Sequence, residues 1–182
     1  MEWLKSTLGY SASEMELIRY GFSVITMEAS KFLIMLLLFI LLDKPLEYLF
    51  SAFILVLLRT NAGGLHFPSY LSCLLFSIFF FCASCILLPH SIPISDIGML
   101  VSLFCCIVIT YLIGPVVSKE RPVPTAKQAK RGKIETFKII FFYFIIVFLF
   151  SKNNLLIVGF WTIILQTIQL IIACLLRKEK FK

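Results

Sequence analysis

Charged side chains are scarce in this sequence, in which Asp, Glu, Lys and Arg make up 15% of 182 residues and apolar residues make up 60%. The mean hydropathy of +0.98 is far above that of globular proteins. A soluble domain of this length could not bury so much apolar surface, and a disordered chain would carry more charge. At about 20 residues per crossing, the composition predicts an all-α integral membrane protein with roughly six transmembrane helical segments.

Acidic side chains are few, since 10 Asp and Glu stand against 17 Lys and Arg, and the net charge is +7. In a membrane protein, the positions of Lys and Arg indicate first how the chain is oriented across the membrane. They are weaker evidence for a phosphate-bearing ligand. We therefore expect no nucleic-acid partner.

The six cysteines do not indicate a disulfide framework. Most of them fall inside apolar runs, where cysteine behaves as a small hydrophobe. These are Cys82, Cys85, Cys105, Cys106 and Cys174. A zinc site needs three or four converging ligands, and no such group is evident, so we predict neither a metal nor another cofactor.

Apolar segments follow one another along the chain with short polar breaks. The predicted spans are 22–42, 46–58, 70–88, 97–117, 137–150 and 155–176. The second is the shortest and fits either a crossing completed by its flanks or a re-entrant segment. Ser13 to Phe22 is amphipathic and is expected to form a helix along the interface, and Met1 to Ser13 does not resemble a cleavable signal. We predict a single polytopic domain over residues 1–182.

Basic residues concentrate in the longest polar segment, 118–136, which we predict to be a loop. It carries Lys119, Arg121, Lys127, Lys130, Arg131 and Lys133. If this loop is cytoplasmic, counting spans in both directions places both termini and segment 59–69 on the cytoplasmic side. The sequence therefore predicts a multi-pass protein of the cell membrane with this topology.

His66 and Cys73 are the histidine and cysteine that share one membrane boundary in this topology. A thiol needs a base to become a nucleophile, and imidazole is the usual one. On one continuous helix the two would lie about 10 Å apart along the axis, too far for proton transfer. Gly63, Gly64 and Pro68 favour a loop instead, from which His66 could fold back towards Cys73 in the second turn of the next helix. On spacing alone, an interfacial histidine and a packing cysteine remain the alternative.

The pattern Arg59-x-x-x-x-Gly64-x-His66-x-Pro68-Ser69-x-x-x-Cys73 resembles the core motif of the accessory gene regulator B family, the membrane cysteine endopeptidases of Gram-positive quorum sensing. Gly114-Pro115-Val116 and the proline and basic residues up to position 133 resemble the family's cytoplasmic loop. Residues 19–31 are similar to its N-terminal region. The resemblance covers nearly the whole chain.

This resemblance implies a reaction and a substrate. Cys73 would be the nucleophile and His66 the base. The enzyme would remove the acidic C-terminal tail of a short amphipathic propeptide through a thioester, and the propeptide's internal Cys or Ser would then close a thiolactone or lactone ring. The partners implied are this propeptide, the lipid bilayer and, because family members act as dimers, a second copy of the chain.

Several other residues have supporting roles under this reading. Arg59 would clamp a substrate carboxylate or anchor a lipid headgroup. Asn61 would orient His66, and Gly63 and Gly64 would shape the backbone and expose N–H groups for an oxyanion. Lys127, Lys130 and Arg131 would recruit the acidic tail, although membrane orientation and anionic lipid explain them equally well.

Two other functions remain open from the sequence. A small transporter or exporter would use Glu28 and Lys31, which lie three positions apart and are expected to pair within the membrane. A membrane acyltransferase would use the same cysteine and histidine on lipid.

Overall fold

A computed structural model describes residues 12–65, 69–116, 125–150 and 153–179. The chain divides into two compact units, Met1–Leu42 and Asp43–Lys182. The described residues are helical apart from short connections, as expected of a chain whose backbone must satisfy its own hydrogen bonds in lipid. The prediction of an all-α membrane protein is confirmed.

The first unit contains one long helix, α2 (Ala12–Leu41). It runs without a break through the predicted interfacial segment and the first predicted span, where we expected two parts. Lys31 Nζ donates a hydrogen bond to Glu28 Oε1, which confirms the expected pairing. The Lys31 side chain is 10% exposed and the Glu28 side chain 65% exposed, so the pair neutralises the more deeply placed charge.

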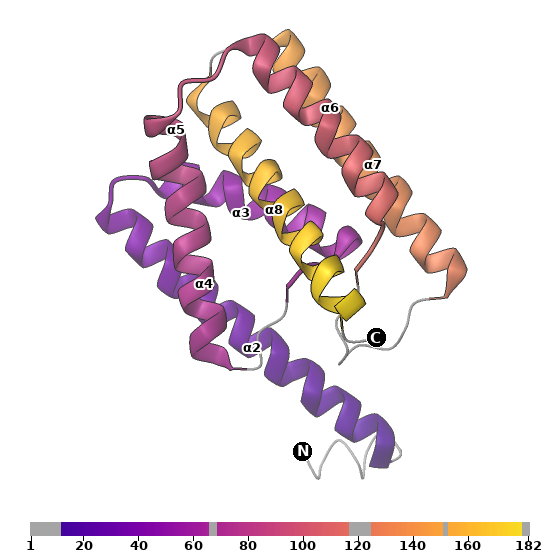
Figure 1. The fold of residues 1–182 in the computed structure, drawn as a ribbon. Coiled ribbons are helices and arrows are strands. Elements are labelled where there is room, and N and C mark those ends of the chain that lie inside the picture. The colour runs from indigo at the N-terminus through magenta and orange to yellow at the C-terminus, as the bar shows by residue number, and fades with distance from the viewer. Residues whose placement is uncertain (1–11, 66–68, 117–124, 151–152, 180–182) are drawn as a thin grey trace. The chain divides into compact units, whose positions relative to one another are not determined.

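The second unit is a helical bundle around α8 (Asn154–Glu179). Its other elements are α3 (Pro45–Ala62), α4 (Tyr70–Cys82), the π-helical turn η1 (Ala83–Leu87), α5 (Leu88–Ser91), α6 (Asp96–Ile113) and α7 (Ala126–Leu149). α8 packs against α3, α6, η1 and α5, while α7 packs against α6 and α3 (Figure 1). Large apolar side chains, including Leu103, Ile140, Phe160 and Ile163, form the buried core between them.

Four helical stretches among the described residues are long and apolar enough to cross a membrane. They are Glu14–Leu41, Tyr70–Ser91, Asp96–Ile113 and Asn154–Leu176. The other two predicted spans, 46–58 and 137–150, are also helical, within α3 and α7. These two helices carry charged residues as well, such as Glu47 in α3 and Lys133 in α7. Membrane crossing by α3 and α7 stays a prediction.

The helix that starts as α4 continues past Pro89, beyond the end of the predicted span 70–88. A helical proline lacks an N–H, and its ring clashes with the carbonyl four residues earlier, here that of Cys85. Cys85 lies within η1, whose wider turn is closed by a hydrogen bond from the Leu88 N–H to Ala83 O. The π turn thus accommodates the proline, and the helix ends only after Ser91.

α7 begins at Ala126, so the prediction of a loop was wrong for residues 126–136. The Gln128 N–H donates to the Thr125 hydroxyl, and the Thr125 N–H donates to Gln128 Oε1. This reciprocal capping box satisfies N–H groups that a helix start leaves open. The basic residues that follow therefore lie on a helix.

Hydroxyl groups in the bundle interior are satisfied by one another. The Ser51 hydroxyl lies 2.7 Å from that of Thr162 and 3.2 Å from that of Ser84, and none of the three residues is exposed. A buried hydroxyl without a partner is unfavourable in apolar surroundings. The network therefore fixes α3, η1 and α8 in one register.

Gly159 allows α8 to approach its neighbours closely. A Cβ at this position would lie 2.5 Å from the Tyr143 hydroxyl oxygen and 2.6 Å from Ile54 Cδ1. The Tyr143 hydroxyl donates a hydrogen bond to Leu156 O, so it cannot turn away without losing a buried bond. The packing of α3, α7 and α8 therefore depends on the absence of a side chain here.

We expect Gly159→Val to lower the free energy of unfolding by about 1–3 kcal/mol, because the added carbons overfill the core. The measurement is the midpoint of thermal unfolding in detergent. Gly21→Val is the matched control, since a Cβ at Gly21 meets nothing within 4 Å. Equal midpoints for the two variants would contradict the close packing described.

Candidate functional site

The turn after α3 is closed by a glycine that touches a distant part of the chain. Gly63 has a φ of 78°, and its N–H donates to Arg59 O. The Val116 N–H donates to Ala62 O at 2.9 Å, which pairs Val116 with Gly63 in an isolated parallel bridge. A Cβ on Gly63 would lie 2.0 Å from the Val116 carbonyl oxygen. The contact therefore requires glycine for both its space and its φ.

Val116 reaches this turn because α6 ends at Ile113, short of the predicted end at 117. Gly114 takes a φ of 66° and its N–H bonds to Thr110 O, which closes the helix. Pro115 then prevents any further helical turn, since it has no N–H to donate. Residues 114–116 leave the helix and run alongside the end of α3.

Polar side chains from α3 and α8 converge on the next residue, Gly64. Gln166 Nε2 donates to Gly63 O at 2.9 Å, and Arg59 Nη2 donates to Leu65 O at 2.6 Å. A Cβ on Gly64 would lie 3.5 Å from Gln166 Nε2, 3.7 Å from Arg59 Nε and 3.7 Å from Gln169 Oε1. The glycine turn thus lies within a set of amide and guanidinium groups.

The sequence pattern predicted Arg59, Gly63 and Gly64 as site residues, but it did not indicate Gln166 and Gln169. Both glutamines are buried, with 3% and 5% of their surfaces exposed, and the Oε1 atom of each has no hydrogen bond among the described residues. A signal was present, because two amides three positions apart lie on one face of an otherwise apolar span. Polar groups within the membrane are unfavourable enough to indicate function.

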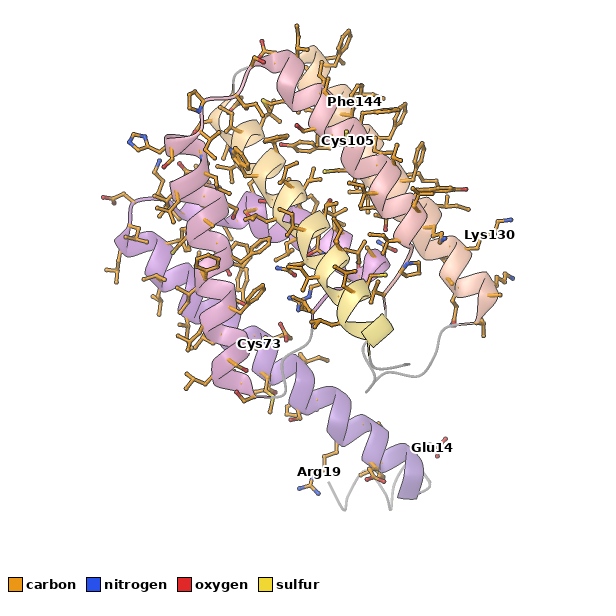
Figure 2. All side chains as sticks on the ribbon, viewed as in Figure 1. Glu14, Arg19, Cys73, Cys105, Lys130 and Phe144 are labelled. Atoms are coloured by element: carbon orange, nitrogen blue, oxygen red, sulfur yellow. The ribbon has the colours of Figure 1, made fainter. Side chains whose placement is uncertain are left out.

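Cys73 lies at the start of α4. Ser69 caps this helix by accepting a hydrogen bond from the Ser72 N–H, and the Cys73 N–H donates to Ser69 O. Cys73 therefore closes the first turn, whereas we expected it in the second. It is half-buried, and no residue between Tyr70 and Phe79 is fully buried. Figure 2 shows Cys73 on this part of α4.

A small cavity lies between the ends of α3, α4 and α8. Its walls are Leu55, Arg59, Phe76, Ser77, Phe80, Phe81 and Gln169. The Ser77 hydroxyl donates to Cys73 O at 2.9 Å, so the helical turn that carries Cys73 is continuous with one wall. On one side the cavity is lined by Arg59 and Gln169, which lie next to the glycine turn. On the other side it is lined by the part of α4 that begins one turn after Cys73.

His66 lies outside the described residues, as do Phe67 and Pro68. Asn61, which we expected to orient His66, uses its Nδ2 to donate to Leu57 O in its own helix at 2.8 Å. Its role towards His66 stays a prediction. In the parts of the chain that are described, no three His, Cys, Asp or Glu side chains gather where a metal ion could be held.

The basic start of α7 packs onto the end of α3, just before the same turn. A Cβ on Gly132 would lie 2.7 Å from Asn61 O, so this glycine allows α7 to contact the end of α3. Lys127, Lys130 and Arg131 are exposed, and Figure 2 shows Lys130 near the start of α7. The positively charged residues predicted to recruit an acidic tail thus come just before Gly132, which contacts the end of α3 at Asn61.

These features define an all-helical membrane protein with a half-buried thiol, a glycine turn and buried amides at the same end of one bundle. The chain belongs to the accessory gene regulator B family, whose family model matches residues 1–170. Membership supports a role in the accessory gene regulator system, and it implies a propeptide substrate and a membrane environment.

Relatives with similar sequences are AgrB-like proteins of two clostridia. The chain is 32% identical over 158 residues to one from Clostridium beijerinckii, a match that covers 85% of this chain and 76% of that protein. It is 27% identical over 152 residues to one from Clostridium perfringens (strain 13 / Type A), covering 80% of this chain and 71% of that protein. No solved structure matches the chain.

Gly63→Ala should loosen the turn, because its Cβ would overlap the Val116 carbonyl and its φ is unfavourable for alanine. The expected loss of unfolding free energy is more than about 1 kcal/mol. It is measured as a lower thermal midpoint and as faster proteolysis between α3 and α4, with Gly21→Ala as the control. A variant as stable and as protease-resistant as the control would refute the close approach.

Proposed function

We propose that the chain is a membrane-embedded cysteine endopeptidase that removes the C-terminal tail of an autoinducer propeptide and promotes cyclisation of the remainder. The observation that carries this proposal is the position of Cys73, half-buried in the first turn of α4 and one helical turn before Ser77, which lines a cavity together with Arg59 and Gln169. Membership of the accessory gene regulator B family supports the same substrate class.

In the first step, Cys73 Sγ attacks the scissile carbonyl carbon and His66 takes the thiol proton. The tetrahedral intermediate then collapses, the C–N bond breaks, and protonated His66 gives its proton to the departing amine of the tail. The product is a thioester between Cys73 and the shortened propeptide. The Gly63 N–H already donates to Arg59 O, so the N–H proposed to stabilise the oxyanion is that of Gly64.

In the second step, an internal thiol or hydroxyl of the propeptide attacks the thioester carbonyl and releases Cys73. Exchange of one thioester for another is nearly neutral in free energy, whereas hydrolysis is strongly favourable. A site that excludes water and holds the internal nucleophile close therefore favours the ring. The apolar walls Phe76, Phe80 and Phe81 suit this requirement.

We expect Cys73→Ala and His66→Ala each to reduce tail removal by about 1,000-fold or more, because each removes a reacting group. Mass spectrometry of a tagged cognate propeptide, co-expressed with equal amounts of each enzyme, measures the product. Cys105→Ala is the matched control, since Cys105 is an exposed cysteine on α6. Cleavage that persists without Cys73 would exclude the mechanism and favour transport.

The exposed face formed by Lys127, Lys130 and Arg131 is proposed to attract the acidic tail on the cytoplasmic side. The three residues lie at helical spacing on α7, and Gly132 brings this helix onto the end of α3, just before the glycine turn. Opposite charges at such a surface mainly raise the rate and local concentration of binding. The placement beside the turn favours tail recruitment over a role in membrane orientation alone.

Neutralising all three residues with glutamine should raise KM about 10-fold at low salt, with a smaller effect at high salt. Lys138→Gln is the control, because Lys138 is exposed on α7 but pairs with Glu135. The effect should vanish for a propeptide whose tail carboxylates are replaced by amides. If the rise in KM were the same with that neutral tail, the basic face would act through lipid or topology.

A further inference from the structure

Lys133 is a half-buried cation on α7 whose side chain crosses the end of α6. Its Nζ lies 3.0 Å from the position that a Cβ on Gly114 would take, and that Cβ would overlap Lys133 Cε. Within the described parts of the chain, the Lys133 ammonium makes no ion pair and no hydrogen bond. An ammonium has three N–H donors, and leaving them open where water is partly excluded is unfavourable. The side chain is therefore available to bind an anion.

The Tyr111 ring holds this cation in place. Lys133 Nζ lies over the ring, 5.8 Å from its centroid. The carbonyl end of α6, at Ile113, is close by and also favours positive charge. Neither the ring nor the helix end carries a full negative charge, so an anion can still bind. Tyr111 is 55% exposed, which leaves the site open to the surroundings.

Exposed apolar side chains lead away from Lys133 along both helices. α6 and α7 pack against each other in opposite directions (Figure 1), so a step away from Lys133 on α7 matches a step away from Tyr111 on α6. The next residues on these two faces, at intervals of three or four positions, are apolar and 39–60% exposed. They are Phe137 and Phe141 on α7, and Val108 and Phe104 on α6. We call these four residues the apolar strip.

Position and charge favour an amphipathic anion over a peptide tail as the occupant of this site. Lys133 lies one helical turn before the predicted span 137–150, where headgroup phosphates border the hydrocarbon. An acidic tail would pair with the cation and leave the apolar strip uncovered. A zwitterionic lipid would bring a second cation to a site that already holds one. A phospholipid with a net negative charge meets both requirements.

We propose that Lys133 binds the phosphate of an anionic phospholipid over the Tyr111 ring, with one acyl chain along the apolar strip. This lipid would contact the segment on which the candidate site depends. Lys133 crosses Gly114, and the glycine turn pairs with Val116, two residues later. A ligand that binds only the folded state stabilises it by mass action. Anionic lipid should therefore stabilise this end of the bundle.

The test uses the full-length protein in nanodiscs of phosphatidylcholine with increasing amounts of phosphatidylglycerol. For the unchanged protein we expect the midpoint of thermal unfolding to rise by about 3–6 °C, the shift produced by a ligand at about ten times its dissociation constant. Native mass spectrometry should show phosphatidylglycerol retained by the protein. Lys133→Gln should weaken this binding about 5- to 10-fold and lose most of the rise, whereas Lys133→Arg should keep it.

Matched controls separate this site from general effects of charge and apolar surface. Lys138→Gln removes the same charge from α7 at a residue that pairs with Glu135, and it should leave the rise unchanged. Phe137→Ala should reduce the retention of phosphatidylglycerol, whereas Phe148→Ala, at the other end of α7, should not. The phenylalanine pair also keeps the test available if Lys133→Gln does not fold.

Three outcomes would overturn the proposal. A loss of midpoint in Lys133→Gln that is equal with and without phosphatidylglycerol would mean that the lysine only stabilises the end of α6. An equal rise produced by soluble glycerol phosphate in phosphatidylcholine discs would mean a phosphate site without a lipid. A higher KM of Lys133→Gln for an acidic-tailed propeptide, with lipid retention unchanged, would assign the lysine to the tail.

Discussion

The close approach of two backbone segments, at Gly63 and Val116, is the contact on which the functional end of the bundle depends. A Cβ on Gly63 would overlap the Val116 carbonyl, and the Ala62 carbonyl receives the Val116 N–H. Once this contact is made, the end of α3 is held against the segment after α6. Cys73 follows in the first turn of α4, which begins at Tyr70.

α8 performs two tasks with one set of polar side chains. In its N-terminal half, Thr162 shares a hydroxyl network with Ser51 and Ser84, which fixes the register of the helices. One helical turn after Thr162, Gln166 bonds to Gly63 O, and Gln169 lines the cavity. A buried polar group without a partner is unfavourable. The need to pair such groups therefore both aligns the helices and directs the glutamine side chains towards the site. α8 therefore contributes side chains both to the bundle core and to the candidate site.

Much of the fold and part of the site could be predicted, because both depend on local patterns. Apolar runs predicted the helices, and the spacing of Arg59, Gly64 and Cys73 indicated the family. The prediction of a loop up to residue 136 was wrong because it relied on the polar, basic composition of the segment. The local signal for a helix start, the capping box of Thr125 and Gln128, was not used. The break predicted at Pro89 was wrong because a π turn before it accommodates the ring.

The amino-acid sequence by itself determined that this is a helical membrane protein, because no soluble fold of this length can bury its apolar residues. It also predicted a glycine-bearing turn after Arg59, which the structure shows at Gly63 and Gly64. Only the tertiary structure decided what surrounds that turn. Gln166 lies 103 residues from Gly63, and Val116 comes from a different connection. Hydrophobic periodicity reports which face of a helix is apolar, but the meeting of distant segments is decided by packing of the whole bundle.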